Sequence, residues 1–395
     1  MMFSAEQREQ YERDGYLILR NQFSDAEMAA LDAVVERNPP LDDSKLVGNW
    51  PEPGRYTLAK SSWCDPDFVR FAEHPKVVDG AKELLNDDIY LTAYVMYDRT
   101  PGGKGIPAHH DYKRWRPVGS SLEWLFTIIP MCDYDESCGQ LYVAPGSHYL
   151  DRQVDRGEGV LHVNEAIRPR EEDFIDPGLK RGDLLFMNMH LWHRAADNNS
   201  DIHRRGLFNK YAAKHYPPAT GYYVFSDEVY EMMSDAGKDL IAVHSNKSIE
   251  TTRLILHRKI DDRSQFFFVK NGNKLSLPGG PVYFEDAIPD WDIGNYIGSL
   301  QTNILKQIRL ETPWVSYIGD YDEGDGLCRV YGYPMNNNGF PVAYHEGEWV
   351  DEALLGEKEF EFSYERKAVA DWLDPTMVRG KGLSQAKSRI DQFAY

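Results

Sequence analysis

The segment Ile106–Trp115 has the sequence IPAHHDYKRW, in which two histidines directly precede an aspartate. Successive side chains of an extended chain point to opposite faces, so only one of the two histidines can share a face with Asp111. That histidine is His109, two residues before the aspartate. An imidazole and a carboxylate on one face suit a divalent transition metal, and a second imidazole would complete a three-ligand set with open positions. A surface histidine beside an aspartate is the plain alternative.

Two histidines further along the chain are candidates for the missing imidazole. Residues 182–200 have the sequence GDLLFMNMHLWHRAADNNS, which contains His190 and His193. On a helix this spacing would bring both rings to one side, but GDLLFMNM is typical of an extended strand. The two side chains then face different ways, so we expect only one of them to be a ligand and the other to be a core histidine.

Four stretches of the sequence, taken in order, resemble the phytanoyl-CoA dioxygenase family of Fe(II)/2-oxoglutarate oxygenases. They are EQREQYERDGYLILRNQFSDAEMAALDAVVE, AHHD, CGQLYVAPGSH and GDLLFMNMHLWHRAADNNSDIHRRGL, and they span roughly residues 4–216. The resemblance implies a double-stranded β-helix core, that is, a cupin-like jelly roll. It also implies Fe(II) as cofactor, 2-oxoglutarate as cosubstrate and O2 as oxidant.

The resemblance assigns roles to individual residues. The iron ligands it implies are His109, Asp111 and His193, because the family's distal histidine lies in a context like WHRAADNNS. The family's arginine, which holds the far carboxylate of 2-oxoglutarate, corresponds to Arg204. Arginine suits this task because its planar guanidinium donates two parallel hydrogen bonds. Arg205 would face the other way in a regular strand, and a slip of one residue would exchange the two.

One position departs from the family pattern. Related oxygenases often place a serine or threonine two residues after the arginine, where this chain has Gly206. We therefore expect the hydroxyl that contacts 2-oxoglutarate to come from Thr127, Tyr94 or Tyr97, with ordinary strand packing as the alternative for each.

The residues around Asp111 are candidates for contact with substrate at the mouth of the barrel. They are His110, Lys113, Arg114 and Trp115. In a chain with a formal net charge of -19, the local KRWR cluster would attract an anionic substrate. A solvated turn that pairs with nearby acidic residues is the alternative.

The resemblance implies that the protein hydroxylates an unactivated C–H bond of a small molecule and releases succinate and CO2. Desaturation or ring formation in a biosynthetic pathway is the alternative within the same chemistry. A cupin-like metalloenzyme that does not use 2-oxoglutarate, and a non-catalytic binding protein, are the alternatives outside it.

The elements that must position these residues are helices followed by strands. Capping patterns predict helices from Ser4 and from Ser24, and a third helical stretch, residues 67–85, is interrupted by Pro75. From Ile89 onward, short aromatic and β-branched runs alternate with turns. The pattern predicts a mainly β fold with flanking helices, the β-sandwich or double-stranded β-helix having its helices on one side.

The chain after Pro218 is harder to place. RLILHRKI and QFFFVK predict strands, NGNK a hairpin turn, and residues 358–372 end in a predicted helix, whereas residues 317–340 are typical of a long ordered loop. We expect an oxygenase core at 1–220 and a C-terminal α+β extension at 221–395. The hypothesis for the extension is a lid or homodimer surface that brings Trp291, Trp314 and Tyr317 near the substrate.

Composition excludes some partners. The acidic balance argues against nucleic acid, which needs a basic face. No run of 18 apolar residues and no signal-peptide core is present, so we expect a cytoplasmic protein without a membrane partner. Four scattered cysteines predict reduced thiols.

Overall fold

The computed structural model describes most of the chain. The described residues are 2–38, 55–57, 65–111, 124–149, 168–218, 221–283, 289–290, 293–294, 296–312, 315–335 and 347–377. Within them the helices are α1 (Ala5–Asp14), α2 (Asp25–Arg37), α3 (Pro66–Ala72), α4 (Pro75–Leu85), α6 (Asp227–Met232), α7 (Asp235–Lys238), α9 (Tyr296–Ile308) and α10 (Glu365–Leu373). Short 3-10 turns are η3 (Ser147–Tyr149), η5 (Glu171–Asp173) and η6 (Glu352–Glu357).

The first two helices begin where the capping patterns predict. Ser4 and Ser24 each accept a hydrogen bond from a backbone N–H in the first turn, and their own backbone N–H groups donate to the side-chain oxygens of Gln7 and Glu27. Gly15 then ends α1 with φ at 80°, a left-handed conformation that glycine adopts without strain. The chain passes directly into β1 (Tyr16–Leu19), as predicted.

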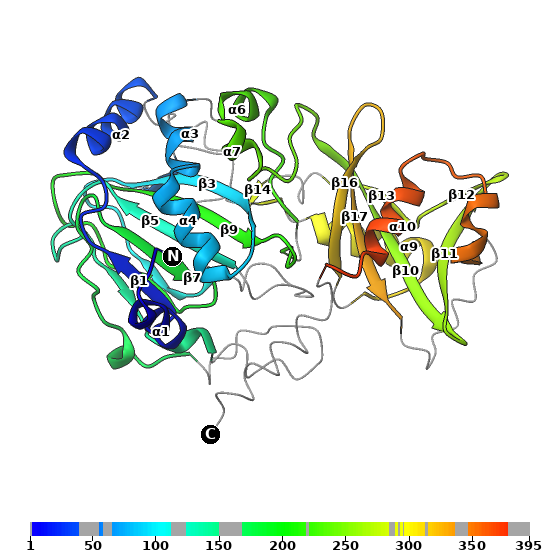
Figure 1. Cartoon of the computed structure of the whole chain (residues 1–395), viewed down its shortest axis with the longest axis horizontal. Coiled ribbons are helices and arrows are strands. Elements are labelled where there is room, and N and C mark those ends of the chain that lie inside the picture. The colour runs from blue at the N-terminus through cyan, green and yellow to red at the C-terminus, as the bar shows by residue number, and fades with distance from the viewer. Residues whose placement is uncertain are drawn as a thin grey trace.

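The larger N-terminal sheet forms one of the two sides of the jelly roll, and we call it the floor. As far as the structure describes it, its strand order is β1-β7-β5-β9-β3-β2. The strands that follow β1 are β2 (Arg55–Thr57), β3 (Ile89–Arg99), β5 (Trp124–Pro130), β7 (Leu184–Asn188) and β9 (Arg204–Ala213). Figure 1 shows α3 and α4 lying across the outer face of this sheet. Proline at the first position of each helix fixes the start of both, and Pro75 thus separates them as the sequence predicts.

A smaller sheet closes the jelly roll. Its strand order is β4-β8-β6, made of β4 (Ile106–His109), β6 (Leu141–Val143) and β8 (His193–Ala195). It faces the floor, since the His193 ring in β8 lies 5.7 Å from the Phe126 ring in β5. Two facing antiparallel sheets with helices on one outer side confirm the predicted fold class.

The alternation of side chains along the floor strands decides which residues can reach the interior. Phe126 faces β8, whereas its neighbour Thr127 faces the helices, where its register partner Asn209 donates a hydrogen bond to the Phe71 carbonyl of α3. Along β9, Lys210, Gly206 and the other even-numbered positions share the face of Phe126. The interior face of β9 therefore carries charged residues at Arg204 and Lys210.

The C-terminal part is built on a second, mixed sheet, which lies beside the jelly roll with α9 and α10 (Figure 1). The described strand order is β12-β11-β10-β17-β16, with β13 on β10 and β18 on β11. The strands are β10 (Ile249–Ile260), β11 (Arg263–Asn271), β12 (Lys274–Ser276), β13 (Gly279–Pro281), β16 (Ser316–Asp322), β17 (Leu327–Pro334) and β18 (Gly347–Asp351). A separate two-stranded pair is β14 (Pro289–Asp290) with β15 (Ile293–Gly294).

The structure confirms three predictions for this part of the chain, namely the two strands, the hairpin turn at Gly272 and the final helix. The loop predicted over residues 317–340 is wrong for residues 317–334, because β16 and β17 form a hairpin there. Its composition hid the strands, since buried polar and glycine positions interrupt the apolar alternation. Asp320 is one of them, and its carboxylate binds the buried guanidinium of Arg329 at 2.7 and 2.8 Å.

The two sheet assemblies share one hydrophobic core. Residues from both belong to the same buried cluster. Phe225 packs against Tyr94 of β3 at 5.6 Å, the Leu91 N–H donates to the Leu240 carbonyl, and Arg329 donates to the Tyr222 carbonyl. The predicted division near residue 220 falls in the segment between the sheets and stays a prediction.

No helix in the described part of the chain is long and apolar enough to cross a membrane. Cys132, Cys138 and Cys328 are free thiols, as predicted, and Cys64 lies outside the described residues.

Candidate active site

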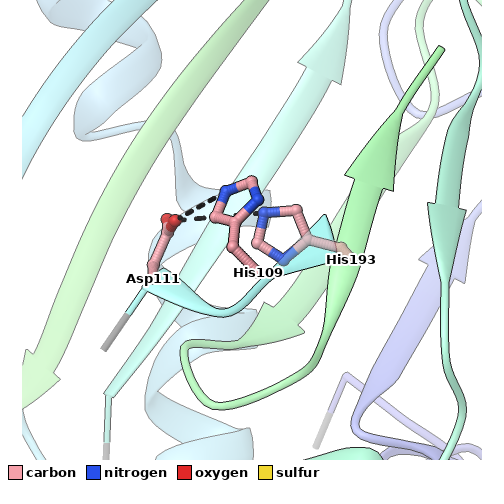
Figure 2. Close-up of side chains that lie close together, drawn as sticks. All are labelled: His109, Asp111 and His193. Carbon is pink, nitrogen blue, oxygen red and sulfur yellow. Dashed lines mark ion pairs between the residues drawn. The ribbon is translucent and has the colours of Figure 1, made fainter. Parts of the chain in front are cut away.

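The pairing of β4 with β8 places two imidazoles face to face. His109 and His193 are direct register partners in this antiparallel pair, and their ring centroids lie 4.3 Å apart. Asp111 follows β4 and turns its carboxylate toward both rings (Figure 2). Its Oδ1 lies 3.5 Å from Nε2 of His109 and 3.9 Å from Nε2 of His193. One donor atom from each of the three side chains falls within 4.8 Å of the others.

The backbone fixes which nitrogen of each ring can bind a metal. The Nδ1 of His109 lies 2.7 Å from the Pro107 carbonyl, and the Nδ1 of His193 lies 3.0 Å from the Leu191 carbonyl. A carbonyl oxygen only accepts hydrogen bonds, so each Nδ1 carries a proton, and Nε2 is the nitrogen that has a lone pair when the ring is neutral. Each Nε2 faces the Asp111 carboxylate, an arrangement typical of metal-binding histidines.

The carboxylate of Asp111 is held in its ionised form. Burial by itself raises the pKa of this group, but the ammonium of Lys210, followed by His109 and His193, lowers the pKa well below its usual value. Lys210 Nζ lies 3.8 Å from Oδ2 of Asp111. No proton therefore competes for the carboxylate at neutral pH. Two imidazoles and one ionised carboxylate fit Fe(II) and leave open positions for further ligands.

His190, the alternative ligand, lies elsewhere. It is fully buried, and its backbone N–H donates to the side-chain oxygen of Asn188. Its ring stacks on that of His110, with the centroids 6.3 Å apart. His110 is fully buried as well and lies 5.1 Å from the Trp192 ring. The role in substrate contact predicted for His110 does not fit this position, because the side chain packs in the core. Lys113, Arg114 and Trp115 lie outside the described residues.

Arg204 and Arg205 point to opposite faces of β9. Arg204 is buried on the interior face, with its guanidinium 3.7 Å from the centroid of the Tyr134 ring. Within the described residues its buried Nε has no hydrogen-bond partner, so a donor remains for a bound anion. Arg205 lies on the outer side, where its Nε contacts the Asp98 carboxylate at 3.1 Å. The arrangement suits a 2-oxoglutarate carboxylate at Arg204 and leaves Arg205 with a structural ion pair.

Comparison with known proteins decides the family. The sequence model described as Phytanoyl-CoA dioxygenase (PhyH) matches residues 11–206. An ectoine dioxygenase of Stutzerimonas stutzeri is 30% identical over 231 residues, which make up 53% of this chain and 76% of that protein.

The chain belongs to the PhyH family. It is an iron- and 2-oxoglutarate-dependent dioxygenase, and its cofactors are Fe(II), 2-oxoglutarate and O2. An ectoine dioxygenase of Bordetella bronchiseptica is 28% identical over 236 residues, covering 53% of this chain and 75% of that protein. A probable alpha-ketoglutarate-dependent hypophosphite dioxygenase of S. stutzeri is 24% identical over 268 residues, covering 61% and 88%.

The structure explains why this PhyH-family chain has glycine at position 206. A Cβ added to Gly206 would lie 2.1 Å from the hydroxyl of Tyr134 and 3.0 Å from the ring of Phe208. Any larger residue would clash with Tyr134, whose ring covers Arg204 and whose hydroxyl donates to the Arg205 carbonyl at 3.0 Å. Burial raises the pKa of the Tyr134 phenol, so the group stays protonated and can donate. The aromatic ring that covers Arg204 thus belongs to a residue that the sequence did not indicate.

Two of the three hydroxyls predicted to contact 2-oxoglutarate do not reach the interior of the jelly roll. Tyr94 packs on Phe68 of α3 at 4.7 Å, and Thr127 donates to the Asn209 carbonyl on the same helix-covered face. These two predictions are wrong because the register of β3 and β5 turns both side chains outward from the site. Tyr97 lies on the interior face, in edge contact with Phe208 at 4.9 Å, and stays a prediction.

Proposed function

We propose that this dioxygenase hydroxylates an unactivated C–H bond of a small anionic or amino-acid-like molecule. In this proposal His109, Asp111 and His193 hold the iron, and Arg204 binds the far carboxylate of 2-oxoglutarate. The observation that carries it is the convergence of three donor atoms within 4.8 Å, with both Nδ1 atoms tied to backbone carbonyls. When bound, Fe(II) would supply the site at which O2 oxidises both the substrate and 2-oxoglutarate, with one oxygen atom going to the hydroxylated product and the other to succinate as CO2 is released.

The protein's own residues provide position and charge. The two backbone carbonyls orient the imidazoles, so no rotation of either ring is needed when the metal binds. Tyr134 covers one face of the Arg204 guanidinium, which fixes its plane for a two-point contact with a carboxylate. Phe126 and Phe208 add apolar surface to the interior beside His193, since the Phe126 ring lies 5.7 Å from that of His193 and 6.4 Å from that of Phe208.

The substrate class rests on charge and on the relatives. The KRWR stretch that follows Asp111 is a local cluster of cations in an acidic chain, which favours an anionic substrate. The relatives are named as dioxygenases of ectoine and of hypophosphite, which supports a small-molecule substrate here. Family membership does not favour a cupin-like enzyme that works without 2-oxoglutarate.

Residues 221–395 remain the proposed C-terminal extension, with a homodimer surface as its proposed role. Of the residues proposed to approach substrate, Tyr317 is buried against Tyr222 at 5.5 Å and bonds to Asp320, so it does not line the active site. Trp291 and Trp314 lie outside the described residues. Sedimentation of the full chain tests the dimer, and a monomer at all concentrations would contradict it.

The central test is anaerobic. Adding Fe(II) and 2-oxoglutarate to the purified chain should give a weak metal-to-ligand charge-transfer band, which Asp111→Ala should abolish. A library of anionic and amino-acid-like compounds is then screened for succinate release. Label from 18-O2 in the product indicates hydroxylation, and an unlabelled product with a new double bond or ring indicates the alternative outcome. Absence of the band in the folded wild-type chain would contradict the proposal.

A further inference from the structure

Lys210 is a cation inside the jelly roll. It lies in the middle of β9, is 2% exposed, and has Phe126 as its register partner in β5. The Phe126 ring lies 5.7 Å from that of His193, so Lys210 enters the interior from the floor beneath the metal ligands. Lysine is rarely buried so completely, because desolvation of an ammonium is costly unless a negative charge offsets it. Among the described residues, Asp111 provides such a negative charge.

The two oxygens of Asp111 have different neighbours. Oδ1 faces the two histidines, at 3.5 and 3.9 Å from their Nε2 atoms. Oδ2 faces Lys210, at 3.8 Å from Nζ. The carboxylate thus has one oxygen turned toward the space between the imidazoles and the other turned toward a fixed positive charge.

We propose that Lys210 is a positioning residue that restricts Asp111 to one-oxygen binding of the metal. The inference rests on the proposed function, in which Asp111, His109 and His193 hold the iron. A carboxylate can bind a metal through one oxygen or through both. Because Lys210 attracts Oδ2, only Oδ1 is left for the metal, and the site keeps its full number of open positions.

Those open positions matter for the cosubstrate. Three protein ligands leave three positions on a six-coordinate ion, and 2-oxoglutarate needs two adjacent ones. A two-oxygen Asp111 would occupy one of the three. Lys210 also adds a positive charge close to the metal, where a doubly anionic cosubstrate must bind. The open position and the positive charge both favour the binding of 2-oxoglutarate, whereas binding of the metal itself needs only the three ligands.

The test compares Lys210→Met, which keeps the length without the charge, with Lys210→Arg, which keeps the charge. Lys104→Met, at an ammonium that is 71% exposed and pairs with Asp197, is the control. Two quantities are measured anaerobically on the full chain. They are the affinity and visible spectrum of Co(II) alone, and the affinity of the Fe(II)-loaded protein for 2-oxoglutarate from the charge-transfer band.

For Lys210→Met we expect Co(II) affinity within about threefold of wild type, an altered Co(II) spectrum, and about tenfold weaker 2-oxoglutarate binding. Lys210→Arg should restore most of the affinity for 2-oxoglutarate, and Lys104→Met should match wild type. Unchanged 2-oxoglutarate affinity and Co(II) spectrum in folded Lys210→Met would overturn the inference, as would complete loss of Co(II) binding. If Lys210→Met does not fold, Lys210→Gln carries the same test. A wild-type chain that binds neither Co(II) nor 2-oxoglutarate would instead refute the proposed function.

Discussion

His109 and His193 are register partners across β4 and β8, and Oδ1 of Asp111 lies within 3.9 Å of Nε2 in both rings. Strand pairing therefore brings together two proposed metal ligands that lie far apart in the sequence. The register also separates adjacent residues by function, because it turns His109 into the site and His110 into the core.

Substitution of the two adjacent histidines should have different effects. His109→Ala should abolish Fe(II)-dependent turnover and metal-induced stabilisation, because it removes a proposed ligand. His110→Ala should keep metal binding but lower the free energy of unfolding by about 2–4 kcal/mol, since it leaves a cavity beside Trp192. Thermal unfolding with and without Co(II) measures both effects. Loss of metal binding in His110→Ala alone would place the register one residue away.

The neighbouring arginines form a second matched pair. Arg204→Lys should raise the KM for 2-oxoglutarate by about 10- to 100-fold, because lysine cannot make the two-point contact. Arg205→Lys should change that KM by no more than about twofold, since its partner is Asp98 on the outer side. Steady-state kinetics with varied 2-oxoglutarate checks both variants. An equal change in the KM for 2-oxoglutarate in the two variants would contradict the assignment of Arg204, and not Arg205, to the cosubstrate.

Gly206 and Tyr134 should show coupled energetics. Gly206→Ala should cost about 2 kcal/mol, because the new Cβ meets the Tyr134 hydroxyl at 2.1 Å. Tyr134→Phe alone should cost about 1 kcal/mol for its hydrogen bond to the Arg205 carbonyl. The double variant should recover about 1 kcal/mol relative to the sum, because the clashing atom is gone. Urea unfolding of all four chains measures the coupling, and strict additivity would contradict the close approach.

The buried ion pair of the second sheet should be far more sensitive than a surface pair nearby. Asp320→Asn should lower the free energy of unfolding by about 3–5 kcal/mol, because it leaves the buried Arg329 guanidinium without its countercharge. Asp322→Asn, at a carboxylate that is 63% exposed and pairs with Lys247, should cost less than about 1 kcal/mol. Denaturant titration compares them. Similar losses at both positions would argue against the burial of the Asp320 pair.

His257 should make part of the stability depend on pH. Burial, and then the charge of Lys259, lowers the pKa of this ring to about 4. The folded protein therefore binds fewer protons than the unfolded chain between about pH 4 and the ordinary histidine pKa of about 6.5. Its contribution is present above that window and is lost as the pH falls through it, by an amount on the order of 2 kcal/mol. His257→Phe keeps the stacking on Phe266 and should remove this part of the slope in unfolding curves taken across the window.

Local patterns predicted the helices and the ligand spacing well because those features depend on near neighbours. The capping boxes at Ser4 and Ser24 and the His-x-Asp pair need only a few residues to be recognised. Which face a floor residue presents depends instead on its register with a distant strand. For that reason Thr127 and Tyr94 were assigned to the wrong side.

The other residues of the site are brought there by tertiary contacts, which a short sequence pattern does not reveal. Tyr134 follows β5 in sequence, yet its ring covers Arg204 in β9. Lys210 did leave a signal, since a lysine within the mostly apolar run LFNKYAA is out of place in a buried strand. Alternation from Arg204 would have placed it on the interior face.

Because the chain is synthesised from its N-terminus, the shared hydrophobic core limits when the jelly roll can complete its packing. All strands that the structure describes in the jelly roll have been made once Ala213 is reached. The outer side of β3, however, still lacks Phe225 against Tyr94 and the Leu240 carbonyl that accepts from Leu91. A nascent chain that ends between these points exposes apolar surface on a complete sheet. We therefore expect the oxygenase half to reach its final packing on the ribosome only after residues 225–241 have emerged.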